Sequence, residues 1–402
     1  MDEKKYMFNK DRDESLSLSF PFDVIKGAAG YYTNVYSSYM EIPKQFLFLS
    51  YLTCLGAVLS KKIRLKSALR TQPRLYTVLV GESAFDRKST AIEYTVDHFE
   101  KIIESFVSCW GLGSAEGLQK VLRKKRKELE EKEIKEFGFI LAFDELKAFV
   151  NKCKIESSVL LPCINTLFES NKYENHTQKA SLEINDAQIS LLGASTVQTY
   201  ETIYNSTFTS IGFPNRIFLV IGTALAKDPF PEEIPRKKIT VMEANLKTIL
   251  NRIGDEKIYD LTEEAKELWH EYYMSINRSS VHSRRLDTYG MRLMMILAAN
   301  RLKKEIDEEI ILDTVKLLNW QYDTRKIYDP IDADTKIARM EESIRRKLFE
   351  KGPLQDRELK QATSANRTGL WIYNNALKNL KSAQEIGWSN EDKKHFLIED
   401  KY

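Results

Sequence analysis

Short apolar runs alternate with helical patterns over residues 71–230, and this alternation predicts an α/β unit. Four runs of β-forming residues are typical of buried parallel strands: 74–80, 138–143, 188–194 and 216–222. Between them lie helical patterns at 88–105, 116–136 and 157–170, a shorter strand at 106–110, and a hairpin-like alternation at 172–187. Strands that alternate with helices are typical of a parallel sheet covered by helices.

Helical patterns flank this unit on both sides and suggest four domains. We predict an N-terminal helical cap (1–70), the α/β core (71–230), a helical lid (231–335) and a C-terminal domain (336–402). The last domain shows three helical patterns, Ile337–Glu350, Asp356–Ala362 and Thr368–Leu380, followed by a hairpin at 385–399. This order is typical of a winged helix, and packing against protein is the alternative to DNA binding for such a module.

Composition adds few constraints. The chain has 402 residues, 43% hydrophobic, with 61 basic and 58 acidic residues and a net charge of +3, so any nucleic-acid footprint must be local. Four cysteines and five histidines show no metal-ligand spacing, which favours reduced thiols. The charged N-terminus lacks a signal-peptide pattern, and the apolar stretch near 46–59 is too short to span a bilayer. We therefore expect a soluble, cytoplasmic protein without a membrane partner.

A candidate nucleotide-binding loop follows the first strand. The segment GESAFDRKST (81–90) stands between a strand and a helix, where backbone N–H groups can bind phosphate; Lys88 would contact the β- and γ-phosphates and Ser89 would hold Mg²⁺. The other candidate ATP-binding positions in this loop are Gly81, Ser83, Arg87 and Thr90. The loop departs from the usual form, because six residues instead of five separate Gly81 from Lys88, and Arg87 replaces the usual glycine. An ordinary turn with a chance Lys-Ser-Thr is the alternative.

Two carboxylates end the second strand. Ile140-Leu141-Ala142-Phe143 runs directly into Asp144 and Glu145, which is a Walker B arrangement. Asp144 would complete the Mg²⁺ shell, and Glu145 would polarise the attacking water. The alternative is a strand that runs into an acidic helix cap.

Three further polar residues are candidates for catalysis. Thr196, beside Ser195 at the end of the third strand, would orient the hydrolytic water, or it simply caps a helix. Arg216, before the last strand, would stabilise the transition state in a neighbouring subunit as an arginine finger, or it is a salt-bridged surface residue. Arg292 stands in an apolar helix and would contact ATP from the lid, with a salt bridge at the core edge as the alternative.

Candidate nucleic-acid contacts lie in three places. The hairpin at 172–187 carries Lys172, His176 and Lys179, which would line a central pore or belong to an exposed turn. The run 123–127 (RKKRK) is strongly basic, but glutamates follow it at once and can pair with it along a solvated helix. In the C-terminal domain the candidates are Arg367, Lys378, Lys381, Lys393 and Lys394.

The stretch from Phe20 to about Gly222 resembles a family of RecA/AAA+-like P-loop ATPases of phages, plasmids and mobile elements. Segments that carry the resemblance are FPFDVIKGAAGYYTNVYSSYMEIP, VGESAFDRKSTAI, GSAEGL, AFDEL, ASTVQTY and GFPNRIFLVIG. The Arg-Lys-Ser-Thr form of the loop occurs in this family. Its members are often associated with primases, and several are described as replicative-helicase-like. The resemblance implies ATP binding more firmly than unwinding, and it implies that any priming comes from a separate protein.

These observations lead to one expectation and two alternatives. We expect ATP hydrolysis with Mg²⁺, coupled to translocation on, unwinding of or remodelling of DNA by a homo-oligomeric ring such as a hexamer, with a separate primase or loader. One alternative is an ATP-switched, initiator-like DNA-binding protein with little turnover. The other is a scaffold whose loop binds no nucleotide.

Overall fold

A five-stranded, all-parallel sheet forms the centre of the molecule. The computed structural model describes residues 18–82, 86–134, 136–176, 181–203, 208, 211–223, 230–278, 280–329 and 336–398. The sheet has the order β3-β4-β7-β2-β8, made of β2 (Tyr76–Gly81), β3 (Phe106–Trp110), β4 (Gly138–Phe143), β7 (Ile189–Thr196) and β8 (Phe218–Ile221). Every residue of β2 and β4 is buried, as expected for strands covered on both faces. The expected α/β class with a parallel sheet is confirmed.

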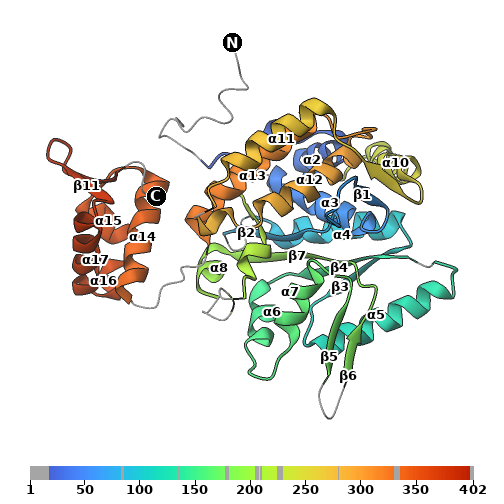
Figure 1. Cartoon of the computed structure of the whole chain (residues 1–402), viewed down its shortest axis with the longest axis horizontal. Coiled ribbons are helices and arrows are strands. Elements are labelled where there is room, and N and C mark those ends of the chain that lie inside the picture. The colour runs from blue at the N-terminus through green and yellow to red at the C-terminus, as the bar shows by residue number, and fades with distance from the viewer. Residues whose placement is uncertain are drawn as a thin grey trace.

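Helices cover both faces of the sheet (Figure 1). One face is covered by α3 (Lys44–Val58) and α4 (Lys88–Ile102), and the other by α6 (Leu146–Cys153) and α7 (Leu160–Leu167). Helix α3 is buried along almost its whole length and contacts four of the five strands. Its sequence is apolar all round, which is typical of a helix inside a core.

Several element boundaries differ from the prediction. Strand β7 continues two residues beyond the predicted end and includes Thr196, whereas β8 begins two residues later than predicted. The late start of β8 has a local cause, because Pro214 opens the short 3₁₀ helix η2 (Pro214–Arg216) and places Arg216 before the strand. The predicted hairpin is confirmed as β5 (Tyr173–His176) and β6 (Ser181–Ile184). Helices α6 and α8 (Val197–Ile203) were not predicted, and the predicted helix at 157–170 is shortened to α7.

The N-terminal and central helical regions pack on each other beside the sheet (Figure 1). Strand β1 (Ile63–Leu65) pairs in parallel with β9 (Lys257–Tyr259), and the Asn300 side chain accepts a hydrogen bond from the Ala29 amide at 2.7 Å. One continuous apolar core extends from Phe20 to Trp320. The predicted cap, α/β core and lid therefore share a single core. The helices and turns of these regions are η1 (Phe22–Val24), α2 (Gly27–Tyr39), α5 (Ala115–Glu130), α10 (Arg236–Ile253), α11 (Glu263–Ser275), η3 (Val281–Ser283), α12 (Leu286–Asn300) and α13 (Glu308–Tyr328).

Residues 336–398 form a smaller unit with its own core, seen beside the main body in Figure 1. Its elements are α14 (Lys336–Lys351), β10 (Leu354–Gln355), α15 (Asp356–Ala362), α16 (Ala365–Thr368), α17 (Leu370–Ser382), β11 (Ile386–Ser389) and β12 (Lys394–Leu397). The strands form an antiparallel sheet in the order β10-β12-β11. The helix predicted at 368–380 is confirmed as α17, which starts two residues later because Gly369 (φ +118°) separates it from the short α16. In the described part of the chain, no helix combines the length and apolar character needed to cross a bilayer.

Candidate functional site

Three strands bring the candidate residues to one edge of the sheet. Gly81, the last residue of β2, is the Cα partner of Thr196, the last residue of β7. On the other side of β7, Phe143 of β4 pairs with Gly193, and Asp144 and Glu145 follow directly. In open parallel sheets, ligands bind outside the carboxyl ends of the strands. The loop after β2, Thr196 and the two carboxylates therefore belong to the same candidate site.

The loop is packed tightly around Gly81. A Cβ added there would lie 2.5 Å from the Asp86 carboxylate and 2.8 Å from the carbonyl oxygen of Gly222, so that a larger residue is excluded. Asp86 is fully buried, and its carboxylate accepts a hydrogen bond from the Glu82 amide. Asp86 was not among the residues predicted for this site, because an aspartate in a loop gives no signal that it faces inward. Ser83 lies outside the described residues.

Arg87 has the backbone conformation that its position requires. It precedes α4 with φ 49° and ψ 33°, in the left-handed region that usually favours glycine. Glycine is therefore usual at this position for a conformational reason, and arginine adopts the same conformation at a cost of about 1–2 kcal/mol. The exposed Arg87 guanidinium lies 3.4 Å from the Glu41 carboxylate.

Lys88 opens α4 and is turned toward the loop. Its side chain belongs to a residue only 9% exposed, and Nζ donates to the carbonyl oxygens of Gly81 (3.1 Å) and Glu82 (2.7 Å). Burial lowers the pKa of Lys88, while the carboxylates of Asp86, Glu145 and Glu82 oppose that shift. The Glu145 carboxylate is therefore close enough to interact electrostatically with Lys88, although Glu145 follows β4 and Lys88 follows the loop after β2. A buried ammonium on two neutral carbonyls is suited to receive an anion.

The residues expected to hold Mg²⁺ are exposed at the same edge. Ser89 and Thr90 lie in the first turn of α4, Ser89 exposed and Thr90 half-buried, and Asp144 and Glu145 are both exposed. Glu145 also caps α6, because its carboxylate accepts from the Lys147 amide at 3.3 Å. Within the described ranges, no group of three or more His, Cys, Asp or Glu side chains is arranged to hold a metal ion. A hydroxyl with one carboxylate suits Mg²⁺, which usually keeps several waters and takes phosphate oxygens as ligands.

Thr196 caps a helix at the edge of the loop. Its Oγ1 accepts a hydrogen bond from the Thr199 amide at 3.1 Å, at the start of α8. The expected alternative, a helix cap, is therefore present. The hydroxyl can still donate its own hydrogen, so the cap does not exclude an additional role toward water.

Arg216 lies at the opposite edge of the sheet from the loop. It precedes β8, whose first residue pairs with Thr77 near the start of β2. The five steps from Tyr76 to Gly81 span about 17 Å at ~3.3 Å per residue. Arg216 is half-buried, and Nη1 donates to the carbonyl oxygens of Ile211 (3.1 Å) and Gly212 (2.8 Å). This position excludes a contact with the loop of its own subunit.

The nucleotide contact expected of Arg292 is wrong. Arg292 is 1% exposed, and its guanidinium donates to the carbonyl oxygens of Arg74 (2.7 Å) and Phe168 (2.9 Å) and to Glu169 (3.0 Å). Arg74 precedes β2, so these contacts lie at the amino end of the sheet, opposite the loop. Burial lowers the pKa of Arg292, and Glu169 opposes this. Arg292 is therefore a core residue that ties α12 to the sheet, in line with the alternative weighed from the sequence.

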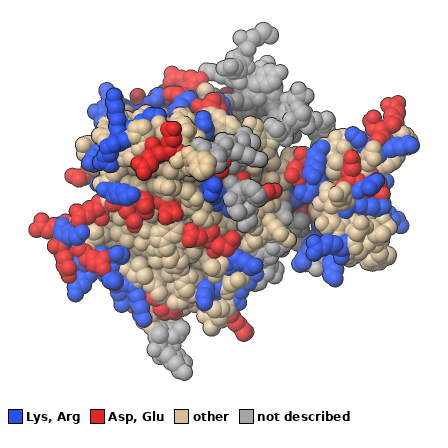
Figure 2. Space-filling model, turned by 180° about the vertical axis from the view of Figure 1, so that it is seen from behind, with Lys and Arg blue, Asp and Glu red and all other residues tan. Residues whose placement is uncertain are grey.

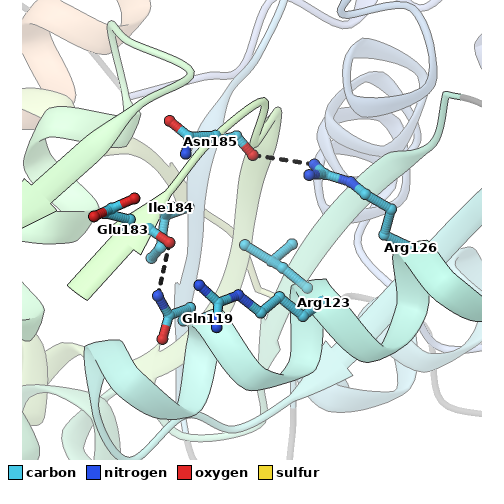
Figure 3. Close-up of a pocket in the computed structure, with 7 residues that line it drawn as sticks. Gln119, Arg123, Arg126, Glu183, Ile184 and Asn185 are labelled. Carbon is cyan, nitrogen blue, oxygen red and sulfur yellow. Dashed lines mark hydrogen bonds between the residues drawn. The ribbon is translucent and has the colours of Figure 1, made fainter. Parts of the chain in front are cut away.

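The β5–β6 hairpin is held against α5 (Figure 3). Gln119 donates to the Glu183 carbonyl oxygen at 2.7 Å, and Arg126 donates to the Asn185 carbonyl oxygen at 3.0 Å. Both residues lie beside a pocket that Arg123 also lines. On the hairpin, Glu174 lies 2.5 Å from Lys172 and 4.0 Å from His176. Lys172 and His176, two of the three candidate pore residues, are thus exposed but close to a carboxylate. The third, Lys179, lies outside the described residues.

The basic run on α5 is partly neutralised, as the sequence alternative proposed. Glu128 lies 3.0 Å from Lys125 and 3.8 Å from Lys124, at spacings of three and four residues. Basic and acidic side chains are interspersed over the face of the main body that Figure 2 shows. A nucleic-acid contact here would have to be local.

The C-terminal candidates lie on exposed surfaces of the small unit. Arg367 on α16 and Lys378 and Lys381 on α17 are exposed, and the Lys381 Nζ lies 5.6 Å from the ring centre of Trp388. Lys393 is exposed in the β11–β12 turn, and Lys394 is half-buried in β12.

Comparison with known proteins adds no assignment: no family model matches the chain, and no curated protein matches it either.

Proposed function

We propose that the protein is an Mg²⁺-dependent ATPase whose site lies at the carboxyl edge of the five-stranded sheet. The observation that carries the proposal is the meeting of three strand ends. Lys88 follows β2, Thr196 ends the neighbouring β7, and Asp144 and Glu145 follow β4 on the far side of β7. The order β3-β4-β7-β2-β8 supports the RecA/AAA+-like family that the sequence resembles.

Each residue has a role suited to its position. The N–H groups at the start of α4 favour an anion, and the missing side chain of Gly81 leaves room for the Asp86 carboxylate, around which the loop turns. The Lys88 ammonium would leave the carbonyls of Gly81 and Glu82 and bind the β- and γ-phosphates. Ser89 and Asp144 would hold Mg²⁺, which when bound neutralises charge on the transferred phosphoryl group. Glu145 would orient and polarise the attacking water, with Thr196 beside it.

The position of Arg216 favours a site shared between subunits. Because Arg216 lies at the amino edge of the sheet, it can stabilise transition-state charge only on the nucleotide of a neighbouring molecule. A head-to-tail interface of this kind closes into a ring when the rotation between subunits permits it. A homo-oligomeric ring, such as a hexamer, is therefore the assembly that we propose.

DNA is the proposed substrate of the motor. The β5–β6 hairpin projects from the main body in Figure 1, and its bracing by α5 would transmit movement of the core to a bound strand. The order of α14, β10, α15, α17 and the β11–β12 hairpin supports a winged helix in the C-terminal unit. Priming or loading would come from a separate protein.

ATP turnover by the whole protein tests the proposal, with and without single-stranded and duplex DNA. We expect turnover that rises with DNA and is lost in both Lys88→Ala and Glu145→Gln. Lys101→Ala and Glu93→Gln are matched controls, because both residues are exposed on α4 away from the loop. Tight ATP binding without turnover would instead favour the ATP-switched DNA-binding alternative. Absence of both binding and turnover would contradict the nucleotide site itself.

A further inference from the structure

Helices α16 and α17 contain no acidic residue of their own, although Glu341 of α14 accepts a hydrogen bond from Asn379 of α17 at 2.7 Å. The stretch 359–384 contains Lys360, Arg367, Lys378 and Lys381 but no Asp or Glu, in a chain that has 58 acidic residues among 402. Lys360 is paired with Asp356, whereas Arg367 and Lys378 are exposed. A polyanion approaching this surface would meet cations without nearby carboxylates from the same segment.

One side of α17 exposes residue types that hydrogen-bond to or pack on bases. Trp371, Asn374 and Lys378 are spaced by three and four residues, so they lie on one face of the helix, and all three are exposed. Trp371 is 69% exposed, and Leu370 beside it is 48% exposed. The opposite face, with Tyr373, Ala376 and Leu380, is buried in the small core.

The two neighbouring asparagines of α17 differ in whether their side-chain amides already form hydrogen bonds within the protein. The Asn375 amide donates to the Trp371 carbonyl oxygen at 2.8 Å, which holds it along the helix. Asn374 makes no such bond to any part of the chain that the structure describes, so its amide can both donate and accept. An asparagine amide matches the N6 and N7 edge of adenine in the major groove, and an apolar side chain matches the thymine methyl group.

We propose that the outward face of α17 is a base-reading surface for duplex DNA. Asn374 hydrogen-bonds an adenine edge, Trp371 and Leu370 pack on a thymine methyl beside it, and Lys378 and Arg367 bind the flanking phosphates. Duplex RNA is not the expected ligand, because its major groove is too deep and narrow for side chains to read. The inference deepens the proposed function, since it rests on DNA as the partner and names sequence-specific duplex binding as a second activity.

Selection of duplexes from a random-sequence library by the full-length protein, without nucleotide, tests the inference. We expect an enriched motif that contains an A·T step. Asn374→Ala should lower discrimination at one position about 10- to 100-fold, as expected for loss of a bidentate base contact. Lys378→Ala should weaken binding to all duplexes alike and reduce the slope of log K against log salt by about one. Lys351→Ala, an exposed lysine at the end of α14, is the matched control.

Three results would overturn the inference. They are selection of no motif by the wild type, an unchanged motif in Asn374→Ala and Trp371→Ala, or a change of protein association in Trp371→Ala with DNA binding intact. Thermal unfolding of each variant checks that the small core is retained. ATP turnover is measured on the same samples. Loss of the motif with turnover intact contradicts only this inference, whereas a motif retained in a protein without turnover contradicts only the proposed ATPase.

Discussion

Gly81 and Thr196 stand opposite each other as Cα partners at the carboxyl ends of β2 and β7. The pairing places the Thr196 hydroxyl next to the first residue of the candidate phosphate loop. Because β7 separates β2 from β4, the same hydroxyl lies between the loop and the Asp144-Glu145 pair. The register of two strands thus determines which polar side chain stands beside the hydrolytic water in the proposed mechanism.

Thr196→Val should lower the rate of ATP hydrolysis about 100-fold while ATP affinity stays nearly unchanged, because a hydrogen bond to the attacking water contributes mainly in the transition state. The same change removes the cap on α8 and should lower the free energy of unfolding by about 1 kcal/mol. Thr196→Ser keeps the hydroxyl and should retain most of both properties. Single-turnover rates and ATP titration separate the two effects. Unchanged hydrolysis in Thr196→Val would assign the residue to the cap alone.

Arg87→Gly should leave ATP turnover within a few-fold of the wild type. Arg87 occupies the left-handed region, so glycine removes strain of about 1–2 kcal/mol but gives up an exposed contact with Glu41 worth at most ~1 kcal/mol. Arg87→Val is the contrasting variant, because a β-branched residue fits this region badly and should lower both stability and turnover. Urea unfolding and steady-state turnover check both. A loss of activity in Arg87→Gly equal to that in Lys88→Ala would instead give the guanidinium a direct role.

Sequence patterns were most informative where a local rule acts alone. Continuous apolar runs predicted β2 and β4, and the strand-loop-Lys88 order predicted a helix start after the loop. The α/β class followed from the alternation of these elements. The roles of the candidate residues in nucleotide binding and catalysis stay predictions.

Contacts between distant segments could not be predicted in the same way. The parallel pair β1-β9 joins Ile63 with Lys257, and no pattern in either short segment indicates its partner. Burial of Asp86 depends on the turn of the loop around Gly81. The position of Arg292 depends on which end of the sheet α12 packs against. An apolar helix pattern does not indicate that end.

Arg292→Met should destabilise the protein without changing its affinity for ATP. The substitution leaves the carbonyl oxygens of Arg74 and Phe168 without this donor, whereas the Glu169 carboxylate keeps its contact with Arg285; we expect a cost of about 3 kcal/mol. Thermal unfolding measures the first effect and ATP titration below the unfolding temperature the second. Arg252→Met, at an exposed position of α10, serves as the control. A large loss of ATP affinity with stability unchanged would restore the contact between Arg292 and ATP that the sequence predicted.

Buried His98 should make the protein less stable as the pH falls. Its ring packs against Tyr32 and Phe99, its Nε2 has no partner among the described residues, and burial lowers its pKa from 6.5 to about 4. The unfolded chain therefore takes up the proton first, and stability is lost as the pH falls from 6.5 to 4. The full loss is about 3 kcal/mol at 1.36 kcal/mol per unit of pKa.

Urea unfolding at pH 7.5 and pH 5 checks the effect of His98. His98→Phe should show a smaller loss of stability at pH 5 than the wild type does, whereas His270→Gln, at an exposed position, should behave as the wild type. The comparison between variants removes the contribution of other titrating groups. An equal pH dependence in the wild type and His98→Phe would show that the ring is protonated in the folded protein.

Arg216→Ala should lower ATP hydrolysis by about 10³-fold or more if the guanidinium acts on a neighbouring subunit as an arginine finger. The decisive test mixes it with Lys88→Ala, which has an intact Arg216 but an inactive loop. In a mixed ring, an Arg216→Ala subunit supplies an intact loop, and a neighbouring Lys88→Ala subunit supplies an intact Arg216. Random 1:1 mixing therefore gives both an intact loop and an intact arginine at about one quarter of the sites. We therefore expect turnover in the mixture although each variant alone is inactive.

Recovery in the mixture separates catalysis in trans from a structural role of Arg216. In the structure, Arg216 also donates to the carbonyl oxygens of Ile211 and Gly212, so Arg216→Ala can disturb the turn before β8. A defect of folding stays within the mutated subunit and is not rescued by mixing, whereas a missing trans contact is. Size-exclusion chromatography shows that both variants still assemble. Assembly of mixed rings without any recovery would assign Arg216 to the stability of its own subunit.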